Sequence, residues 1–300
     1  MNKQQIGDSS LYVSEIGLGC MSLGTDEENA KKIIDTAISN EINYLDTADL
    51  YDQGVNEELI GKAIKGKRND VILATKVGNR FERGKDGWEW DPSKTYIKSA
   101  VKESLRRLQT DYIDLYQLHG GTIDDPIDEI IEAFEELKEE GIIRYYGISS
   151  IRPNVIKQFC KQSSIISVMM QYSILDRRPE ELFTFLKEHN VSVLARGPVA
   201  KGILTDKSSN RLGKDYLSYS SQELKNISSS IKNISNKHSL TSTALHYCLH
   251  DEVVAAAVVG ASSIEQIEKN INAINTLTLA DDELNKIKEI SKASLYEQHR

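Results

Sequence analysis

The sequence predicts an α/β fold, a (β/α)8 barrel of the TIM type that spans residues 1–300 as one domain. Short apolar runs alternate with amphipathic segments along the chain, and this order is typical of parallel strands joined by right-handed crossovers. Ionisable side chains also stand at or just past the ends of three successive runs, where barrel enzymes carry their chemistry. The residues in question are Asp46, Tyr51, Lys76 and His119.

An N-terminal β-hairpin is expected before the barrel. Residues 4–13 are polar and carry the turn residues Gly7 to Ser10 between their halves. The first barrel strand is then expected at 15–19. Its helix begins near Asp26, because apolar residues follow at helical spacing from position 30 to position 38.

Seven further apolar runs bring the expected number of barrel strands to eight. They cover residues 42–45, 71–75, 113–118, 143–148, 167–171, 191–195 and 253–259. Helix starts are indicated by Ser93, Pro126, Pro153 and Pro179, because serine caps a first turn and proline is tolerated within it.

Extra helices are expected before strand eight and at the C-terminus. Residues 197–251 form a longer connection, in which a Ser/Asn/Lys-rich stretch at 206–237 precedes a helix at 241–249. Its low apolar content predicts a surface excursion on the active face rather than a second domain. The helical pattern at 281–291 predicts a helix that covers one side or end of the barrel.

The composition favours a compact, soluble enzyme in the cytoplasm. A formal charge of −8 and scattered basic residues argue against a nucleic acid or an anionic membrane as partner. Cys20, Cys160 and Cys248 lack metal or redox spacing, which indicates reduced thiols and no metal site. No signal peptide and no membrane-spanning apolar run is recognisable. The oligomeric state is left open.

Each of the four ionisable residues also has an ordinary structural explanation. An aspartate at a strand end often caps the next turn, a lysine there is usually solvated, and structural ion pairs perturb pKa values too. The joint occurrence of all four at the ends of consecutive strands is harder to explain by chance.

Several segments carry a resemblance to a known family. Residues 43–51 (NYLDTADLY), followed by 56–61 (NEELIG), resemble the aldo-keto reductase signature. Residues 73–78, 114–119, 147–150 and 259–262 resemble later blocks of that family in the same order. The resemblance implies an NADPH-dependent carbonyl reductase on a (β/α)8 barrel, with the cofactor extended across the barrel mouth and a small carbonyl compound as substrate.

Carbonyl reduction gives the four side chains a common purpose. Hydride must reach carbon and a proton must reach oxygen, so an acid must stand within hydrogen-bond reach of the carbonyl oxygen. Tyr51 is the candidate acid, Lys76 can stabilise its phenolate, and Asp46 can hold Lys76 in place and ionised. His119 would donate to the substrate oxygen and orient it.

The resemblance also implies the residues that hold the cofactor. Ser149 and Gln171 should reach the nicotinamide carboxamide, the loop from Arg196 to Gly202 should cover the pyrophosphate, and the helix start after strand eight should bind the adenosine end. The full implied set is Met21, Asp46, Ser149, Gln171, Arg196, Gly197, Pro198, Val199, Lys201, Gly202, Gly260, Ser262, Gln266 and Asn270. Other family members often have an aromatic residue at the Arg196 position, where it stacks on the nicotinamide, and a planar guanidinium can stack too.

Two questions stay open at this level. NADP(H) is the expected cofactor and NAD(H) is possible, because Gly260 and Gln266 occupy positions where some branches carry Lys and Arg for the 2′-phosphate. Two other activities are conceivable. One is an NADP(H)-binding redox-sensing or regulatory subunit with slow turnover, and the other is a Schiff-base aldolase that uses Lys76.

Overall fold

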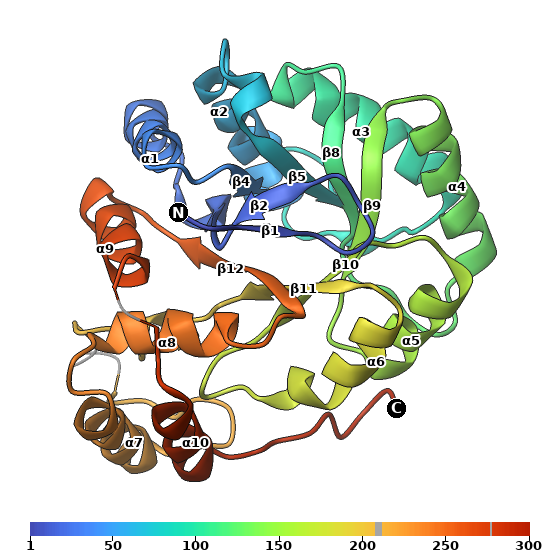
Figure 1. The fold of residues 1–300 in the computed structure, drawn as a ribbon. Coiled ribbons are helices and arrows are strands. Elements are labelled where there is room, and N and C mark those ends of the chain that lie inside the picture. The colour runs from blue at the N-terminus through green and yellow to red at the C-terminus, as the bar shows by residue number, and fades with distance from the viewer. Residues whose placement is uncertain (208–211, 277) are drawn as a thin grey trace.

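The eight expected apolar runs form a closed barrel of parallel strands in the computed structural model, which describes residues 1–207, 212–276 and 278–300 (Figure 1). The last strand pairs with the first and closes the barrel. In chain order, the barrel strands are β3 (Ile16–Gly19), β4 (Tyr44–Asp46), β5 (Ile72–Val77), β8 (Ile113–Leu118), β9 (Ile143–Ser149), β10 (Ser167–Gln171), β11 (Ser192–Arg196) and β12 (Val254–Gly260). The predicted fold class is therefore confirmed.

Alternation along the strands decides which side chains enter the barrel. Because neighbouring residues of a strand face opposite sides, Leu45 packs against the outer helices while Tyr44 joins the interior cluster. On β5, Leu73 faces outward and Ala74 inward in the same way. The next inward positions are those of Asp46 and Lys76, at the upper end of the interior.

The helices surround the barrel and begin close to the expected positions. Ser93 caps its helix by accepting a hydrogen bond from the backbone of Tyr96, and Asp26 caps the first helix in the same way. The helices are α1 (Glu27–Ser39), α2 (Val55–Ala63), α3 (Lys94–Leu108), α4 (Ile127–Glu139), α5 (Pro153–Gln162), α6 (Phe183–Glu188), α7 (Ser221–Ile234), α8 (Leu240–Leu249), α9 (Ile264–Ile274) and α10 (Asp281–Ile290). Pro179 lies in a short 3-10 turn, Arg178–Leu182, that precedes α6.

Helix α2 was not placed from the sequence, and two further elements were not expected. Helix α7 lies inside the Ser/Asn/Lys-rich stretch, where Leu224, Ile227 and Ile231 form a narrow buried stripe. Part of that stretch, 208–211, lies outside the described residues. The second element is a two-stranded arm between β5 and α3, made of β6 (Asn79–Arg80) and β7 (Glu89–Trp90).

The N-terminal hairpin, β1 (Lys3–Gln5) and β2 (Tyr12–Ser14), closes the lower end of the barrel, where the strands begin. The Gly7 amide donates to Ser192 Oγ at 2.8 Å and the Ser10 amide donates to Tyr145 Oη at 3.0 Å. Gly7 has a φ of +47° and no room for a Cβ, which would lie 2.3 Å from a backbone oxygen. The predicted hairpin is therefore present and covers the lower end of the barrel.

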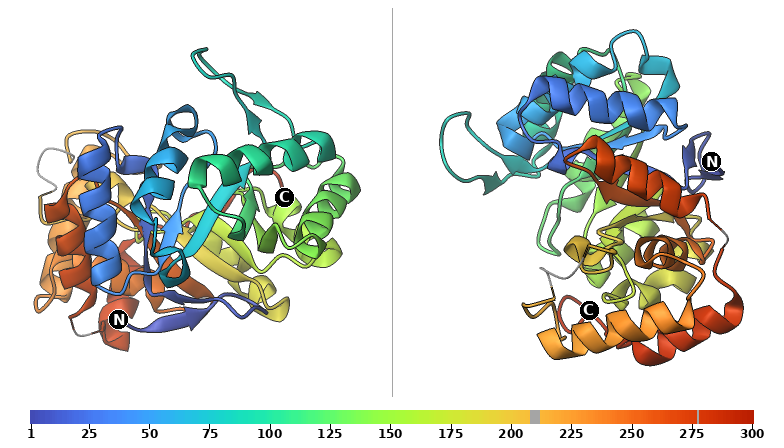
Figure 2. Two further views of the ribbon diagram at one scale, coloured as in Figure 1. Left: turned by 90° about the horizontal axis from the view of Figure 1, so that it is seen from above. Right: turned by 90° about the vertical axis from the view of Figure 1, so that its left-hand side faces the viewer.

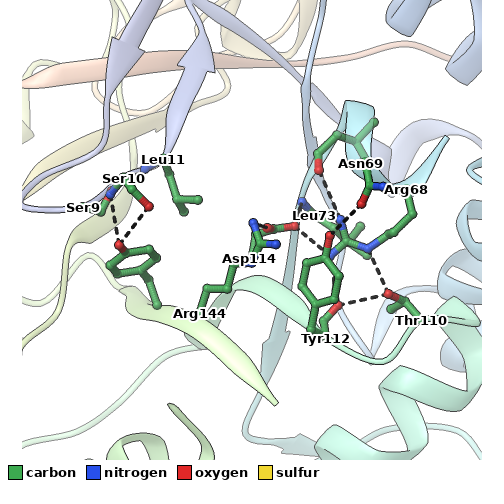
Figure 3. A network of polar contacts seen from close by, with 12 residues as sticks. Ser9, Ser10, Leu11, Arg68, Asn69, Leu73, Thr110, Tyr112, Asp114 and Arg144 are labelled. Atoms are coloured by element: carbon green, nitrogen blue, oxygen red, sulfur yellow. Dashed lines mark hydrogen bonds and ion pairs between the residues drawn. The ribbon is translucent and has the colours of Figure 1, made fainter. Parts of the chain in front are cut away.

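A polar cluster built on Asp114 ties the strand starts together at the lower end (Figure 3). Asp114 is buried and its carboxylate pairs with Arg68 at 2.7 Å and with Arg144 at 3.0 Å. It also accepts a hydrogen bond from the Leu73 amide at 2.9 Å. Both guanidinium groups lie over the ring of Tyr112, at 3.9 and 4.3 Å from its centroid. We refer to Asp114, Arg68, Arg144 and Tyr112 as the lower cluster.

Candidate active site

Three neighbouring strands bring the candidate catalytic residues together at the upper end of the barrel. Asp46 ends β4, Lys76 is the penultimate residue of β5, and His119 directly follows β8. The pairing register aligns Asp46 with Ala74 and aligns Lys76 with Gln117, so the side chains converge above the interior layer. We refer to Asp46, Tyr51, Lys76 and His119 as the upper cluster.

The Lys76 ammonium is the centre of the upper cluster. Its Nζ donates to Asp46 Oδ2 at 2.7 Å, to the Thr47 backbone oxygen at 2.6 Å and to Tyr51 Oη at 3.3 Å. Asp46 Oδ1 in turn accepts from Gln117 Nε2 at 3.3 Å. The lysine thus has three hydrogen-bond acceptors for its three N–H donors.

Electrostatics keep Lys76 charged although its side chain is buried. Burial alone lowers the pKa of Lys76, but the charges of Asp46 and Tyr51 and their hydrogen bonds outweigh it, so its pKa is raised. Burial raises the pKa of Asp46, and the interaction with Lys76 opposes that effect. The result is an ammonium that stands beside the phenol of Tyr51.

His119 is the second polar side chain next to the Tyr51 ring. The two ring centroids lie 5.9 Å apart with an interplanar angle of 85°. Burial and the charges of Lys76 and Arg196 lower the pKa of His119 to about 3. The imidazole is therefore neutral near pH 7, and a neutral imidazole has one N–H to donate.

Tyr51 is presented by a tight turn between β4 and α2. The residues after it, Asp52, Gln53 and Gly54, have φ angles of 48°, 52° and 86°. A left-handed conformation at two consecutive residues other than glycine is uncommon and strained. The turn lets the chain reverse immediately after Tyr51 and enter α2, while the phenol stays beside Lys76.

A cleft of about 1860 Å³ opens above the upper cluster. Asp46, Tyr51 and His119 line it, whereas Lys76 lies below its floor. All the residues that the sequence implied for the cofactor also line this one cleft. They are Met21, Ser149, Gln171, Arg196, Gly197, Pro198, Val199, Lys201, Gly202, Gly260, Ser262, Gln266 and Asn270, in addition to Asp46.

The loop after β11 forms one wall of the cleft. Arg196 is exposed, and its charge acts on both Asp46 and His119. Gly197, Lys201 and Gly202 have φ angles of 68°, 55° and 85°, so the backbone turns sharply here. Next to this wall, the Gln171 amide donates to Tyr216 Oη at 3.1 Å.

The start of α9 forms the far end of the cleft. Ser263 caps the helix, and the Ser262 amide donates to Gln266 Oε1 at 2.9 Å. Lys207 and Lys269 line the same end and both pair with Glu265, each at 2.8 Å. These two lysines were missed from the sequence, because nothing in their local pattern sets them apart from solvated lysines.

The C-terminal segment and the 216–218 region also line the cleft and were not expected there. Tyr296 is buried, its amide donates to Glu181 Oε1 at 3.1 Å, and the Asn154 amide donates to the His299 backbone oxygen at 2.8 Å. By contrast, the aromatic residues Phe81, Trp88 and Trp90, which follow Lys76 in the sequence, do not line the cleft. In the described residues no helix is long and apolar enough to span a bilayer, and no His/Cys/Asp/Glu group has a metal-binding arrangement.

The closed barrel and the cleft above the upper cluster are typical of a barrel enzyme, and comparison with known proteins identifies the family. The sequence model of the Aldo/keto reductase family matches residues 15–292. The chain is 56% identical over 305 residues to the uncharacterized oxidoreductase YqkF of Bacillus subtilis (strain 168), with all of both chains covered. It is 30% identical over 290 residues to L-galactose dehydrogenase of Arabidopsis thaliana, covering 91% of this chain and 88% of that protein.

Solved structures agree with this result. The holo form of the aldo-keto reductase AKR11C1 from Bacillus halodurans superimposes with a TM-score of 0.97 at 62% identity, covering 100% of this chain and 99% of that one. The apo form of the same protein gives a TM-score of 0.88. The chain belongs to the aldo/keto reductase family, and the resemblance found in the sequence is confirmed.

Proposed function

We propose that this protein reduces an aldehyde or ketone to an alcohol with NADPH, and that Tyr51 donates the proton. The observation that carries the proposal is the buried Lys76 ammonium, 3.3 Å from the Tyr51 hydroxyl and 2.7 Å from the Asp46 carboxylate, directly below the cleft. This arrangement supplies an acid that can protonate a carbonyl oxygen and a fixed positive charge that stabilises the phenolate left behind.

The residues of the cleft fit a dinucleotide. At one end, Ser149 and Gln171 offer the hydroxyl and amide groups that would hold a nicotinamide carboxamide. Glycines in the wall after β11 let the backbone approach a pyrophosphate closely. At the other end, the first turn of α9 together with Lys207 and Lys269 suits phosphate groups, which supports NADPH as the dinucleotide. When bound, the nicotinamide supplies hydride.

The side chains of the upper cluster then divide the remaining work. Tyr51 gives its proton to the substrate oxygen, and the Lys76 ammonium stabilises the phenolate that is left. Asp46 holds the ammonium in position through its 2.7 Å contact. His119 donates its N–H to the same oxygen and stabilises the charge that develops there.

A Schiff-base aldolase fits this geometry poorly. Such a lysine must be a neutral amine with access to its substrate, which requires a lowered pKa. Lys76 is fully buried, all of its N–H groups are engaged and its pKa is raised. The lysine is therefore placed to act as a fixed charge.

The test of the proposal is NADPH oxidation by the wild-type protein against a panel of aldehydes, ketones, quinones and sugars. We expect multiple turnover with at least one carbonyl class, and faster turnover with NADPH than with NADH. Tight NADPH binding in a fluorescence titration, without turnover on any carbonyl, would instead favour the regulatory-subunit alternative. Equal affinity for NADH and NADPH would contradict the choice of cofactor.

A further inference from the structure

The arm between β5 and α3 extends away from the body of the barrel as a narrow two-stranded element (Figure 2). It contributes no residue to the lining of the cleft. Apart from contacts with α2 and α3, its contacts with the rest of the protein converge on two loops, the turn that carries Tyr51 and the loop that carries His119. This pattern calls for a role other than substrate contact.

The first set of contacts joins the tip of the arm to the Tyr51 turn. Gln53 Oε1 accepts from the Gly84 amide at 2.7 Å, and Gln53 Nε2 donates to the Lys85 backbone oxygen at 2.9 Å. An ion pair between Arg83 and Glu58 at 3.0 Å joins the arm to the start of α2. The Gln53 side chain therefore binds the arm backbone as a peptide group would, with one donor and one acceptor used together.

These contacts hold a turn that would not keep its shape unaided. Asp52 and Gln53 both have positive φ angles, and such residues cost about 1–3 kcal/mol each when they are not glycine. A conformation of that cost persists only where the surroundings fix it. The arm supplies part of that fixation, because it binds the side chain of Gln53, which directly follows Asp52 and lies two residues after Tyr51.

The second set of contacts joins the base of the arm to the His119 loop. The Trp90 ring packs on Gly78 and Gly120, where an added Cβ would lie 2.6 and 3.2 Å from the ring. Trp90 Nε1 donates to Asp125 Oδ1 at 2.9 Å. Asn79 Nδ2 donates to the backbone oxygen of His119 at 3.3 Å.

We propose that the arm is a clamp that fixes the separation between Tyr51 and His119, with Gln53 and Trp90 as its positioning residues. Both side chains must reach one carbonyl oxygen, so the clamp sets the geometry in which the proton is transferred. This inference rests on the proposed function, because it assumes that Tyr51 and His119 act on the same substrate atom. Since the arm lies outside the cleft lining, loosening it should change the chemical step and spare cofactor binding.

The first test is Gln53→Ala, which removes both side-chain contacts with the tip of the arm. We expect kcat for carbonyl reduction to fall about tenfold or more, because small misplacements of reacting groups carry large penalties. The dissociation constant for NADPH should stay within twofold of wild type. Asp86→Ala, an exposed change on the same arm, is the matched control and should leave kcat unchanged.

The second test weakens the contact between the base of the arm and the His119 loop. Trp90→Phe keeps a ring on the glycines but removes the hydrogen bond to Asp125. If one clamp is responsible, freeing either end already removes its effect. The fold loss of kcat in the double variant should then be smaller than the product of the fold losses in the two single variants. Losses that multiply would show two independent effects and would overturn the clamp.

Amide hydrogen exchange separates this inference from the proposed function. In Gln53→Ala, amide exchange should accelerate both in the Tyr51 turn and in residues 79–90. Should the wild-type protein reduce no carbonyl while this coupled exchange is seen, the proposed function fails together with the catalytic role of the clamp, and the mechanical coupling of the arm to the Tyr51 turn stands. Wild-type kcat in Gln53→Ala, or exchange that is unchanged in the arm, would refute the clamp.

Discussion

A buried aspartate, a cation and a tyrosine meet at both ends of the barrel. The two clusters differ in whether their polar contacts stay within the protein or reach a group that lines the cleft. In the lower cluster, Asp114 is shared by two arginines and a backbone amide (Figure 3). Arg68 also donates to the backbone oxygens of Val71 and Tyr112 at 3.1 and 2.9 Å. These ion pairs and hydrogen bonds of the lower cluster therefore all join one part of the protein to another.

The upper cluster uses a lysine, and one of its contacts leads outward. Asp46 and the Thr47 oxygen hold two of the Lys76 N–H groups, while the third points to Tyr51, which lines the cleft. Arginine has a fixed fork and is always charged, whereas lysine is a compact charge on a flexible stem. The comparison teaches that similar residues serve stability at the lower end and, in our proposal, chemistry at the upper end.

Among the variants that distinguish the roles of the two clusters, Lys76→Met should have the largest effect. We expect kcat for carbonyl reduction to fall about 10³-fold, within the range for loss of acid–base assistance, because the phenolate of Tyr51 loses its counter-charge. NADPH binding, measured by fluorescence titration, should persist. Lys65→Met, an exposed lysine, should behave as wild type, and wild-type turnover in Lys76→Met would remove the lysine from the reaction.

The reverse pattern is expected for Arg68→Met in the lower cluster. Breaking a buried ion pair should lower the free energy of unfolding by about 3 kcal/mol, because Asp114 stays buried with less compensation. At a temperature where the variant is folded, kcat should remain within twofold of wild type. Urea titration gives the first quantity and NADPH oxidation the second. A large loss of kcat in Arg68→Met would contradict the claim that the lower cluster serves stability and not the reaction.

A smaller effect concerns pH, which acts on the upper cluster through His119. Its folded-state pKa of about 3 lies below the ordinary value. As pH falls, the unfolded chain therefore binds a proton at His119 before the folded protein does, which favours the unfolded state. Stability should therefore be complete above about pH 6.5 and should decline toward pH 3, by about 2 kcal/mol at pH 5. His119→Asn should lack this part of the decline when urea titrations at pH 8 and pH 5 are compared.

The smallest effect is expected for Tyr112→Leu. The ring lies between two guanidinium groups, and the loss of both cation–π contacts should lower the free energy of unfolding by about 1 kcal/mol. Tyr112→Phe keeps the ring and should be nearly silent, because its hydroxyl makes a single long contact of 3.5 Å. Equal losses in the two variants would assign the effect to the hydroxyl.

The strands and the upper cluster could be predicted because both depend on local patterns. Short apolar runs marked the strands, and their order along the chain placed Asp46, Lys76 and His119 at one end of the barrel. The exact bounds of β8 and β10 matched the apolar runs. The use of each cofactor residue stays a prediction, although the cleft gathers all of them.

The parts that were missed depend on partners distant in the sequence. Tyr296 lines the cleft because Glu181 and Arg178 receive the C-terminal segment, and no local pattern encodes that docking. The arm escaped notice for the same reason, since it is held through Gln53 and Asp125. Helix α7 is different. Its N-terminal capping box of Ser220 and Glu223 is local, but the low apolar content of the stretch led to the prediction of a surface excursion there.

The most direct test of the account compares two tyrosine-to-phenylalanine changes, one at each end of the barrel. Tyr51→Phe removes the hydroxyl beside Lys76, and Tyr112→Phe removes one at the lower end. With NADPH and the best carbonyl substrate, we expect kcat to fall at least about 10²-fold for Tyr51→Phe and to stay unchanged for Tyr112→Phe. Near-wild-type kcat in Tyr51→Phe would contradict the assignment of Tyr51 as the proton donor.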